Sequence, residues 1–433
     1  MDPKAAFLRV GAPALPGDAQ RSSKQKAISQ FPYRSFSVKL DKAALKMEFL
    51  RKKLKWIQQT MKEQGIDLWI TFTREGNEDP LAQDLRFSDL TWRSAAIIDQ
   101  DGTKTAVVGG LEVDTIRQNK FYDEVVGYAS EGAAPKLKQI IGKRKPKSIA
   151  VNSSYDEGAA DGITSGMEAY LKRALKGYSK GFVSGEDLAI ALRARLVPEE
   201  VELVKKAIVE CEKIYDEVES AIRPGKKDRY VHEFAHKLLA QRSLSTAWAF
   251  DRCPSVNVGG DPMGHIGYHN TTIRNGDFVK LDFGVNYEGY CSDIQRVYFV
   301  GPGNIPSSVK RMFETARAAN DAALAALKPG TVGYKVDSAG RKLIVKKGYP
   351  EYKHALGHVL GRSTHEIGPL LGPRWPNRYG KQVEKPVQRD MVFTIEPSVT
   401  SKLGTCNLEQ DVLVTASGYQ QLSKPQEDII RVG

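Results

Sequence analysis

Five residues in the last third of the chain constrain its fold and chemistry most: Asp282, Asp293, His358, Glu396 and Glu409. Each lies in an apolar, strand-like segment or beside a turn. Four carboxylates cannot converge on one imidazole without help, because like charges a few ångströms apart repel strongly. Two divalent cations would neutralise such a set. The pattern therefore predicts a two-metal hydrolytic site.

The two aspartates lie in segments with the composition of strands. Residues 278–285 (FVKLDFGV) and 290–300 (YCSDIQRVYFV) are rich in β-branched and aromatic residues, and Glu288-Gly289 between them is a turn signal. A hairpin folded about position 287 or 288 would place Asp282 opposite Asp293, with β-carbons roughly 5 Å apart. Such a pair in an apolar hairpin is unfavourable unless it is paired or metal-bound. Taken alone, the pair fits two exposed loop aspartates equally well.

The histidines narrow the chemistry. His354, His358 and His365 fall within twelve residues of a Gly-rich segment, although the whole chain has only seven histidines. The spacing is not the HExxH pattern of helical zinc proteases, because no glutamate follows His354 or His358. One imidazole among several carboxylates suits Mn, Co, Fe or Zn bound without thiolates.

Two glutamates complete the set. Glu396 ends the apolar segment 391–397 (MVFTIEP), and Glu409 begins the apolar segment 407–415 (NLEQDVLVT). The order Asp, Asp, His, Glu, Glu and the surrounding sequence resemble the pita-bread metallopeptidases, a family that includes prolidase, aminopeptidase P, methionine aminopeptidase and creatinase. The matching segments are GDFVKLDFGVNYEGYCSDIQRVYFV, HALGHVLGRSTHEIGP, MVFTIEP and LEQDVLVT. The resemblance is strong from about residue 196 to residue 433 and weaker upstream.

The resemblance implies a role for each metal ligand. Asp282 would bind one metal only, and Asp293 and Glu409 would bridge both metals. His358 and Glu396 would bind the other metal, and Glu396 would also act as general base. Manganese is the first expectation for the two divalent ions, with cobalt or zinc as alternatives.

The resemblance also implies catalytic histidines. His265, which lies 17 positions before Asp282, matches a substrate-contacting histidine of the family. His354 and His365 match the histidines that flank the metal-ligand histidine. His265 and His365 could stabilise an oxyanion or donate a proton to the leaving nitrogen.

The expected reaction is hydrolysis of Xaa-Pro bonds in short proline-containing peptides. An Xaa-Pro dipeptidase (prolidase) is favoured, and an aminopeptidase P acting on longer peptides is the alternative. A dipeptidase needs a cation for the substrate carboxylate, and Arg374 is the candidate, although a solvated loop arginine is equally consistent with the sequence. A creatinase-like hydrolase and a metal-free binding module are further alternatives, against which the complete ligand set argues.

Four positions depart from the family pattern. Asn407 stands where relatives often have arginine, and Asp390, Ser398 and Asp251 replace residues that are common in relatives. No expected metal ligand is lost. The departures bear on the positioning of Glu409, on rate and on substrate preference.

The predicted fold class is α/β (α+β), with a pita-bread fold preceded by a smaller α/β domain of the creatinase type. We expect an extension at residues 1–38, a non-catalytic domain at 39–195 and the catalytic domain at 196–433. No hydrophobic signal-peptide core is visible in the sequence. The resemblance also implies a homodimer.

Composition excludes several other functions. The net charge of +12 is concentrated in residues 1–62, where a basic run lies on a helix with an apolar face, so we do not expect nucleic-acid binding. No apolar run approaches the length of a membrane span, about 18 residues. The four cysteines show no CxxC spacing, which indicates free thiols and a cytoplasmic protein.

Overall fold

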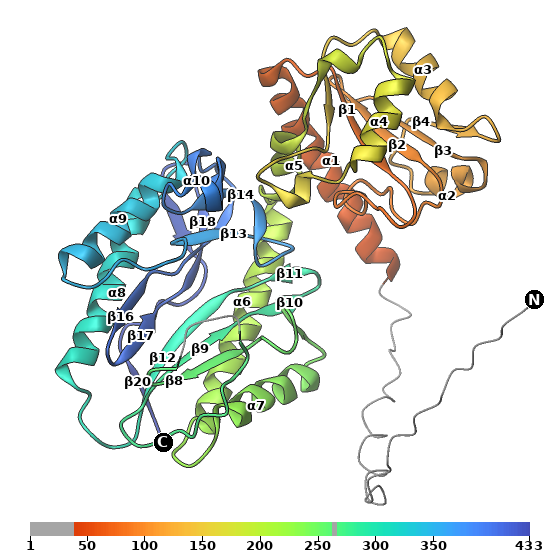
Figure 1. Cartoon of the computed structure of the whole chain (residues 1–433). Helices are drawn as coiled ribbons and strands as arrows, with labels where there is room; N and C mark the ends of the chain where they lie inside the picture. The colour runs from red at the N-terminus through yellow and green to blue at the C-terminus, as the bar shows by residue number, and fades with distance from the viewer. Residues whose placement is uncertain (1–38, 262–265) are drawn as a thin grey trace, which may run out of the picture. The chain divides into compact units, whose positions relative to one another are not determined.

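The computed structural model describes residues 39–261 and 266–433, with side chains from residue 47 onward (Figure 1). The predicted extension at residues 1–38 and the candidate His265 lie outside the described residues. Residues Met47–Gly433 form one compact unit. A division at residue 195 therefore stays a prediction.

The first part of the chain forms a six-stranded mixed sheet in the order β4-β3-β2-β1-β5-β6. Its strands are β1 (Leu68–Thr73), β2 (Ser94–Asp99), β3 (Lys104–Gly109), β4 (Glu124–Tyr128), β5 (Ile149–Val151) and β6 (Phe182–Ser184). The helices of this part are α1 (Lys39–Gln64), α2 (Val113–Gln118), α3 (Ala133–Arg144), α4 (Ser165–Ala174) and α5 (Glu186–Arg193). All six residues of β1 are buried, as expected of a central strand covered on both faces. The α/β character predicted for this part is confirmed.

Four long helices follow residue 196 in the described part of the chain. They are α6 (Pro198–Val218), α7 (Asp228–Gln241), α8 (Ser307–Ala326) and α9 (Gly333–Lys346). Helix α6 begins with a proline at its first turn, followed by Glu199 and Glu200. A proline at this position has no N–H to leave unpaired, and the acids interact favourably with the helix dipole.

Two sheets lie inside these helices (Figure 1). The first has the order β20-β12-β9-β8 and the second the order β14-β13-β15-β18-β19. Their strands are β8 (Ser255–Val258), β9 (Phe278–Phe283), β12 (Ile294–Val300), β13 (Gly357–Leu360), β14 (Glu366–Leu371), β15 (Val392–Ile395), β18 (Gln410–Val414), β19 (Tyr419–Gln421) and β20 (Ile430–Val432). Helix α7 packs on β8, and α9 packs on β14.

Short elements precede or separate the strands of the two sheets. They are β7 (Ser245–Thr246), β10 (Val285–Tyr287), β11 (Tyr290–Cys291), α10 (Pro376–Tyr379), β16 (Ser398–Ser401) and β17 (Gly404–Asn407). Strands β16 and β17 form a hairpin of their own, against which α8 packs.

The predicted opposition of Asp282 and Asp293 is wrong by one residue in the turn. Strands β10 and β11 pair Tyr287 with Tyr290, so the hairpin turns between residues 288 and 289. Both turn residues have positive φ (53° and 90°), as a two-residue type I′ turn requires. Asp282 therefore lies opposite Gln295, and Asp293 lies just before β12.

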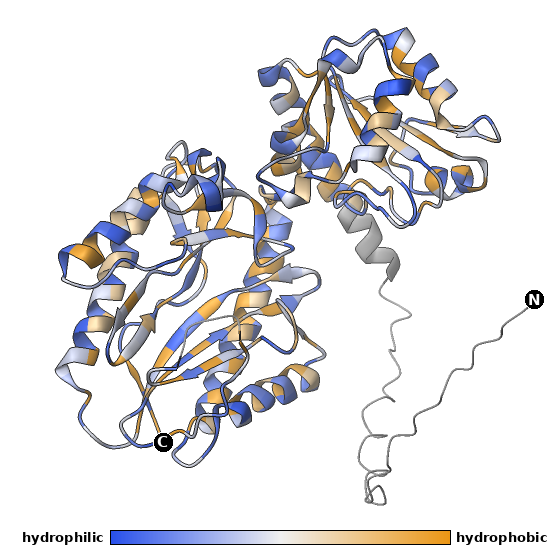
Figure 2. Ribbon diagram, viewed as in Figure 1, coloured by the Kyte–Doolittle hydropathy of each residue, from blue (hydrophilic) through white to orange (hydrophobic). Residues whose placement is uncertain are grey.

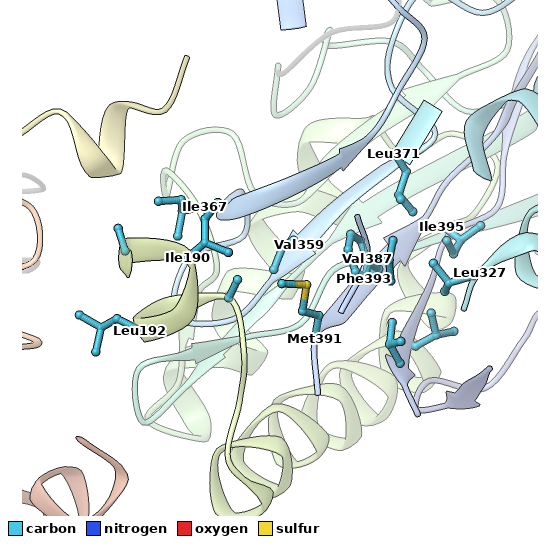
Figure 3. Close-up of a cluster of buried hydrophobic side chains, with 14 of the residues drawn as sticks. Ile190, Leu192, Leu327, Val359, Ile367, Leu371, Val387, Met391, Phe393 and Ile395 are labelled. Atoms are coloured by element: carbon cyan, nitrogen blue, oxygen red, sulfur yellow. The ribbon is translucent and has the colours of Figure 1, made fainter. Parts of the chain in front are cut away.

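A buried apolar cluster fixes the second sheet in place. The helices turn their apolar faces toward the sheets (Figure 2). Ile190 and Leu192 of α5 belong to the same cluster as Val359, Phe393 and residues around them (Figure 3). Val359 directly follows His358, and Phe393 lies on the strand that ends just before Glu396. The packing of this core thus positions two of the candidate ligands.

None of the described helices is long and apolar enough to cross a membrane.

Candidate active site

A cavity of about 750 Å³ opens where the two sheets meet the connecting loops. It is lined by six of the residues predicted from the sequence: Asp282, Asp293, His354, His358, His365 and Glu396. Glu409 does not line this cavity but lies beside it. Asp293, His358 and Glu409 each offer a ligand atom, and these three atoms all lie within 4.8 Å of one another. The structure therefore brings together residues separated by more than a hundred positions.

The remaining candidate ligands surround this group. His358 Nε2 lies 3.6 Å from Asp293 Oδ2 and 3.6 Å from Glu396 Oε1. Glu396 follows β15, and Asp282 lies on β9 at the cavity wall. Each ligand is thus held by a strand or a strand end, which limits its movement.

The hydrogen bonds of His358 determine its tautomer. Nδ1 lies 3.2 Å from the carbonyl oxygen of Val359, which can only accept a hydrogen bond. Nδ1 therefore carries the proton, and Nε2 presents its lone pair to the carboxylates. A backbone carbonyl on the far nitrogen is the arrangement that orients metal-bound histidines.

The carboxylates leave oxygens without protein partners. Among the described residues, Asp293 Oδ1 and both carboxylate oxygens of Glu409 are buried and have no hydrogen-bond partner. A buried carboxylate without partners is strongly unfavourable. The residues with orphaned oxygens are those predicted to bridge two cations, so the donor set fits a pair of divalent metals.

The electrostatics agree with this fit. Burial first, and then the neighbouring acids, raise the pKa of the Asp293 and Glu409 carboxyls well above their ordinary values. Burial and Asp282 raise the pKa of Glu396 to about 8, against the opposing effects of Lys280 and Gln295. The protein alone therefore favours the neutral carboxyls, and cations are needed to hold the ionised forms together.

Two cavity residues were missed in the sequence. Lys280 is buried and lines the cavity, and its pKa is lowered, chiefly by burial. It lies two residues before Asp282 on β9, and the strand period of two puts both side chains on one face. Gln295 Nε2 donates a hydrogen bond to Glu396 Oε2 at 3.2 Å. The sequence signal for these two cavity residues was a lysine and a glutamine at alternate positions of otherwise apolar strands.

The predicted histidines differ in their surroundings. His365 lies with its ring 4.3 Å from that of His358, at the cavity wall. Both ring nitrogens of His354 are hydrogen-bonded within the protein, Nδ1 to Ala355 O at 2.7 Å and Nε2 to Ser398 Oγ at 2.6 Å. His354 is therefore placed to position its neighbours and has no nitrogen available for substrate.

Arg374 does not line the cavity. It stacks on Tyr334 at 3.7 Å and lies 3.4 Å from Glu384, beside a separate depression on α9. Two other arginines, Arg252 and Arg378, line the cavity instead. The arginines that line the cavity are thus different from the one that the sequence suggested.

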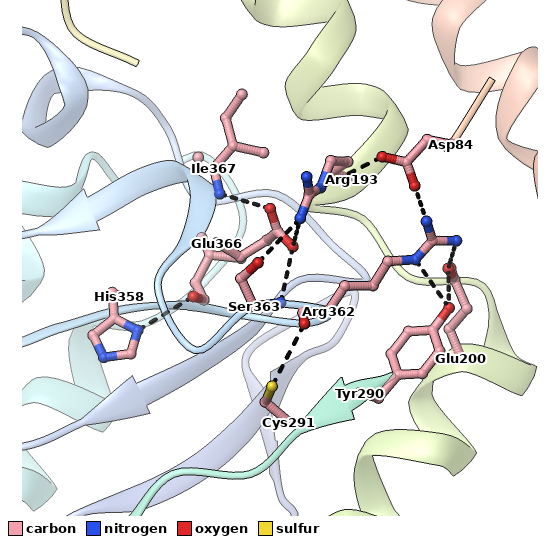
Figure 4. A network of polar contacts seen from close by, with 12 residues as sticks. Asp84, Arg193, Glu200, Tyr290, Cys291, His358, Arg362, Ser363, Glu366 and Ile367 are labelled. Atoms are coloured by element: carbon pink, nitrogen blue, oxygen red, sulfur yellow. Dashed lines mark hydrogen bonds and ion pairs between the residues drawn. The ribbon is translucent and has the colours of Figure 1, made fainter. Parts of the chain in front are cut away.

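The turn between His358 and His365 is fixed by a polar network (Figure 4). Glu366 Oε2 accepts from Arg193 Nη2 at 2.8 Å, and Glu366 Oε1 accepts from the Ile367 N–H at 2.9 Å. Arg362, within the turn, pairs with Asp84. These contacts tie the turn to α5 and to the first part of the chain.

Comparison with known proteins agrees with this geometry. The Metallopeptidase family M24 matches residues 202–416. The Xaa-Pro dipeptidase of Pyrococcus furiosus is 30% identical over 277 residues, which cover 62% of this chain and 75% of that protein. The chain therefore belongs to the metallopeptidase family M24, a class of peptide hydrolases.

Two solved structures show the fold. The Xaa-Pro dipeptidase from Bacillus anthracis aligns with a TM-score of 0.67 at 23% identity, covering 88% of this chain and all (100%) of that one. The X-Pro aminopeptidase from Thermotoga maritima aligns with a TM-score of 0.63 at 25% identity, covering 85% and 98% of the two chains. The predicted pita-bread fold is confirmed.

The raised carboxyl pKa values predict how pH affects the metal-free protein. The pKa of Glu396 rises from 4.5 to about 8 on folding, so the folded protein binds more protons than the unfolded chain between these values. Stability of the metal-free protein should therefore fall as pH rises through this window. Cations replace the protons, so manganese should raise the melting temperature more at about pH 8.5 than at about pH 6.

Calorimetry of chelator-treated protein, with and without manganese at both pH values, measures this effect. A metal-free protein that gains stability across the window would contradict the expected sign.

Asp293→Asn tests the ligand set directly. The substitution keeps the size of the side chain but removes a charge, and we expect metal affinity to fall by more than roughly 100-fold, beyond the loss typical of outer-sphere partners. Metal content after dialysis is the measurement. Asp411→Asn is the matched control, because Asp411 Oδ2 only accepts the Asp293 N–H at 3.2 Å and an amide oxygen can replace it. Equal metal content in wild type and Asp293→Asn would refute the assignment.

Proposed function

We propose that this protein is an Xaa-Pro dipeptidase that uses two divalent metal ions, manganese in the cell. The single observation that carries the proposal is the convergence of Asp293, His358, Glu396 and Glu409, with orphaned carboxylate oxygens, beside a cavity of about 750 Å³. The dipeptidase name of the Pyrococcus furiosus relative supports the choice of substrate.

The metal ligands in this proposal are Asp282, Asp293, His358, Glu396 and Glu409. Two cations held by these residues would supply Lewis acidity, which lowers the pKa of a water molecule and polarises the scissile carbonyl. Glu396, oriented by Gln295, accepts the proton of the attacking water as general base. His365, on the cavity wall, donates a hydrogen bond to the oxyanion that develops on the carbonyl oxygen.

The cavity wall suits a proline ring. Trp248, Ala355, Leu370 and Tyr379 line it with apolar and aromatic surface. The nitrogen of an Xaa-Pro bond has no N–H, so its recognition depends on the shape of the ring site. These side chains can enclose the ring and exclude water from it.

Arg378 is the candidate anchor for the substrate carboxylate. It lies on α10 beside the stacked rings of Trp375 and Tyr379, at 5.6 and 5.2 Å from their centres. Its Nη1 donates to the carbonyl oxygen of Lys353 at 2.8 Å, which fixes the side chain beside the cavity. A guanidinium held this way can pair with a carboxylate through its remaining N–H groups.

The proposal extends to compartment and assembly. All four cysteines are buried and free, which fits the reducing cytoplasm. A homodimer follows from the family resemblance, and light scattering of the purified protein measures it.

An aminopeptidase that releases the first residue from longer Xaa-Pro peptides is the second candidate. A cavity of about 750 Å³ is in the range that holds drug-sized ligands and exceeds the space that a dipeptide fills. The extra volume could receive residues beyond the proline.

One experiment separates the two candidates. The protein is stripped of metal, reloaded with manganese, cobalt or zinc, and offered Leu-Pro beside Leu-Pro-Gly. Metal-dependent cleavage of Leu-Pro alone is the expected result, because a paired carboxylate anchor rejects a longer peptide. Release of leucine from the tripeptide would establish the aminopeptidase. Cleavage of neither peptide by metal-loaded protein would refute both.

Arg378→Ala tests the carboxylate anchor. We expect KM for Leu-Pro to rise roughly tenfold or more, since a charge-assisted hydrogen bond to the carboxylate is lost. Leu-Pro amide lacks the carboxylate and should show no such change. Arg374→Ala is the matched control, because Arg374 lies outside the cavity lining. Equal effects of the two substitutions, or of one substitution on both substrates, would contradict the assignment.

A further inference from the structure

A chain of three side chains runs from the cavity wall behind the candidate metal site. His354 Nε2 lies 2.6 Å from Ser398 Oγ, and Asn407 Nδ2 donates to the same Ser398 Oγ at 2.5 Å. Ser398 and Asn407 are paired directly across the β16–β17 hairpin. Each lies two residues from a candidate ligand, Ser398 after Glu396 and Asn407 before Glu409. Both are departures from the family pattern, and the structure shows that they are partners.

The direction of every hydrogen bond in this chain follows from one carbonyl group. The Ala355 carbonyl oxygen can only accept, so His354 Nδ1, 2.7 Å away, carries the ring proton. His354 Nε2 then accepts from the Ser398 hydroxyl, whose oxygen accepts from the Asn407 amide N–H. With its NH₂ group turned to Ser398, Asn407 must direct its amide oxygen elsewhere.

The neutral state of His354 agrees with this order. Burial lowers the pKa of His354 to about 4, so the ring carries one proton at neutral pH. In a doubly protonated ring Nδ1 would still donate to Ala355 O, but Nε2 would also donate and the bond to Ser398 would reverse.

The amide oxygen of Asn407 is an orphan. The residue is only 1% exposed and lines the cavity, and Oδ1 has no hydrogen-bond partner among the described residues. A buried acceptor without a donor is unfavourable, and such groups in native proteins usually meet water or a ligand. The arrangement leaves a fixed, buried acceptor in a residue of the cavity wall.

The chemistry of the substrate limits which donor can meet this acceptor. The peptide nitrogen of an Xaa-Pro dipeptide has no hydrogen, so the α-ammonium group is the only N–H donor of its backbone. Resting on the proposed function, we propose that Asn407 Oδ1 accepts a hydrogen bond from the substrate's α-ammonium group. Asn407 is then a specificity-determining residue for a free amino terminus, held in orientation by Ser398 and His354.

Binding of two small ligands tests this role without turnover. Leucine carries the α-ammonium group, and 4-methylpentanoate is the same molecule without it. Calorimetric titration of the metal-loaded protein gives the preference for leucine over 4-methylpentanoate. Asn407→Leu should reduce this preference roughly tenfold to hundredfold, the range for a hydrogen bond to a charged group. Asn407→Asp keeps an acceptor oxygen and should retain the preference.

Three controls make the outcome decisive. Metal content is measured for each variant, so that a lost ligand site is recognised. Asn407→Ala gives the same comparison if Asn407→Leu does not fold. Ser398→Ala leaves the Asn407 acceptor in place and should reduce the preference less than Asn407→Leu.

Two results would overturn the inference: an unchanged preference in Asn407→Leu and Asn407→Ala, or an equal loss of affinity for both ligands. The experiments distinguish a failure of the proposed function from a failure of this role of Asn407. Protein that shows the Asn407-dependent preference but does not cleave Leu-Pro refutes the dipeptidase alone. Protein that cleaves Leu-Pro and shows no such preference refutes the role of Asn407 alone.

Discussion

The structure depends on one electrostatic constraint: several carboxylates are buried together around a single imidazole. Asp293 and Glu409 are almost fully buried. Each has carboxylate oxygen without a hydrogen-bond partner, close to the negative charge of the other residue. Neither hydrogen bonds nor solvent can offset that repulsion in an apolar core. The surrounding fold is rigid where it meets these residues, since each stands on a strand or at its end. Only bound cations reconcile the ionised groups with the packing that holds them.

That constraint explains why so much of the site was predictable from the sequence. An acid inside an apolar, β-branched segment is a conflict between local composition and burial, and such conflicts mark functional sites. Glu396 and Glu409 both show it. The segments around them have the composition of strands, so the strands predicted there agree with the structure to within a few residues.

The predictions that failed concern the strand register and the position of one arginine side chain in space. Asp282 would lie opposite Asp293 only if the centre of the hairpin lay at 287–288, and it lies one residue later. A shift of one residue in the centre moves the cross-strand partner by two residues. Arg374 and Arg378 lie four residues apart, yet only Arg378 lines the cavity. Arg374 lies before α10 and Arg378 lies on it, and the sequence does not show which of the two side chains reaches the cavity.

The departures from the family pattern show a different limit of sequence reasoning. Taken one at a time, Ser398 and Asn407 look like losses of common residues. In the structure the two residues are hydrogen-bonded to each other: the Asn407 amide donates to the Ser398 hydroxyl oxygen, and the Ser398 hydroxyl donates to His354. Polar groups in a low-dielectric interior are selected as sets, since a half-satisfied network is less favourable than none. Such a network is therefore best understood as one set of donors and acceptors, and its one acceptor without a partner belongs to Asn407, a residue of the cavity wall.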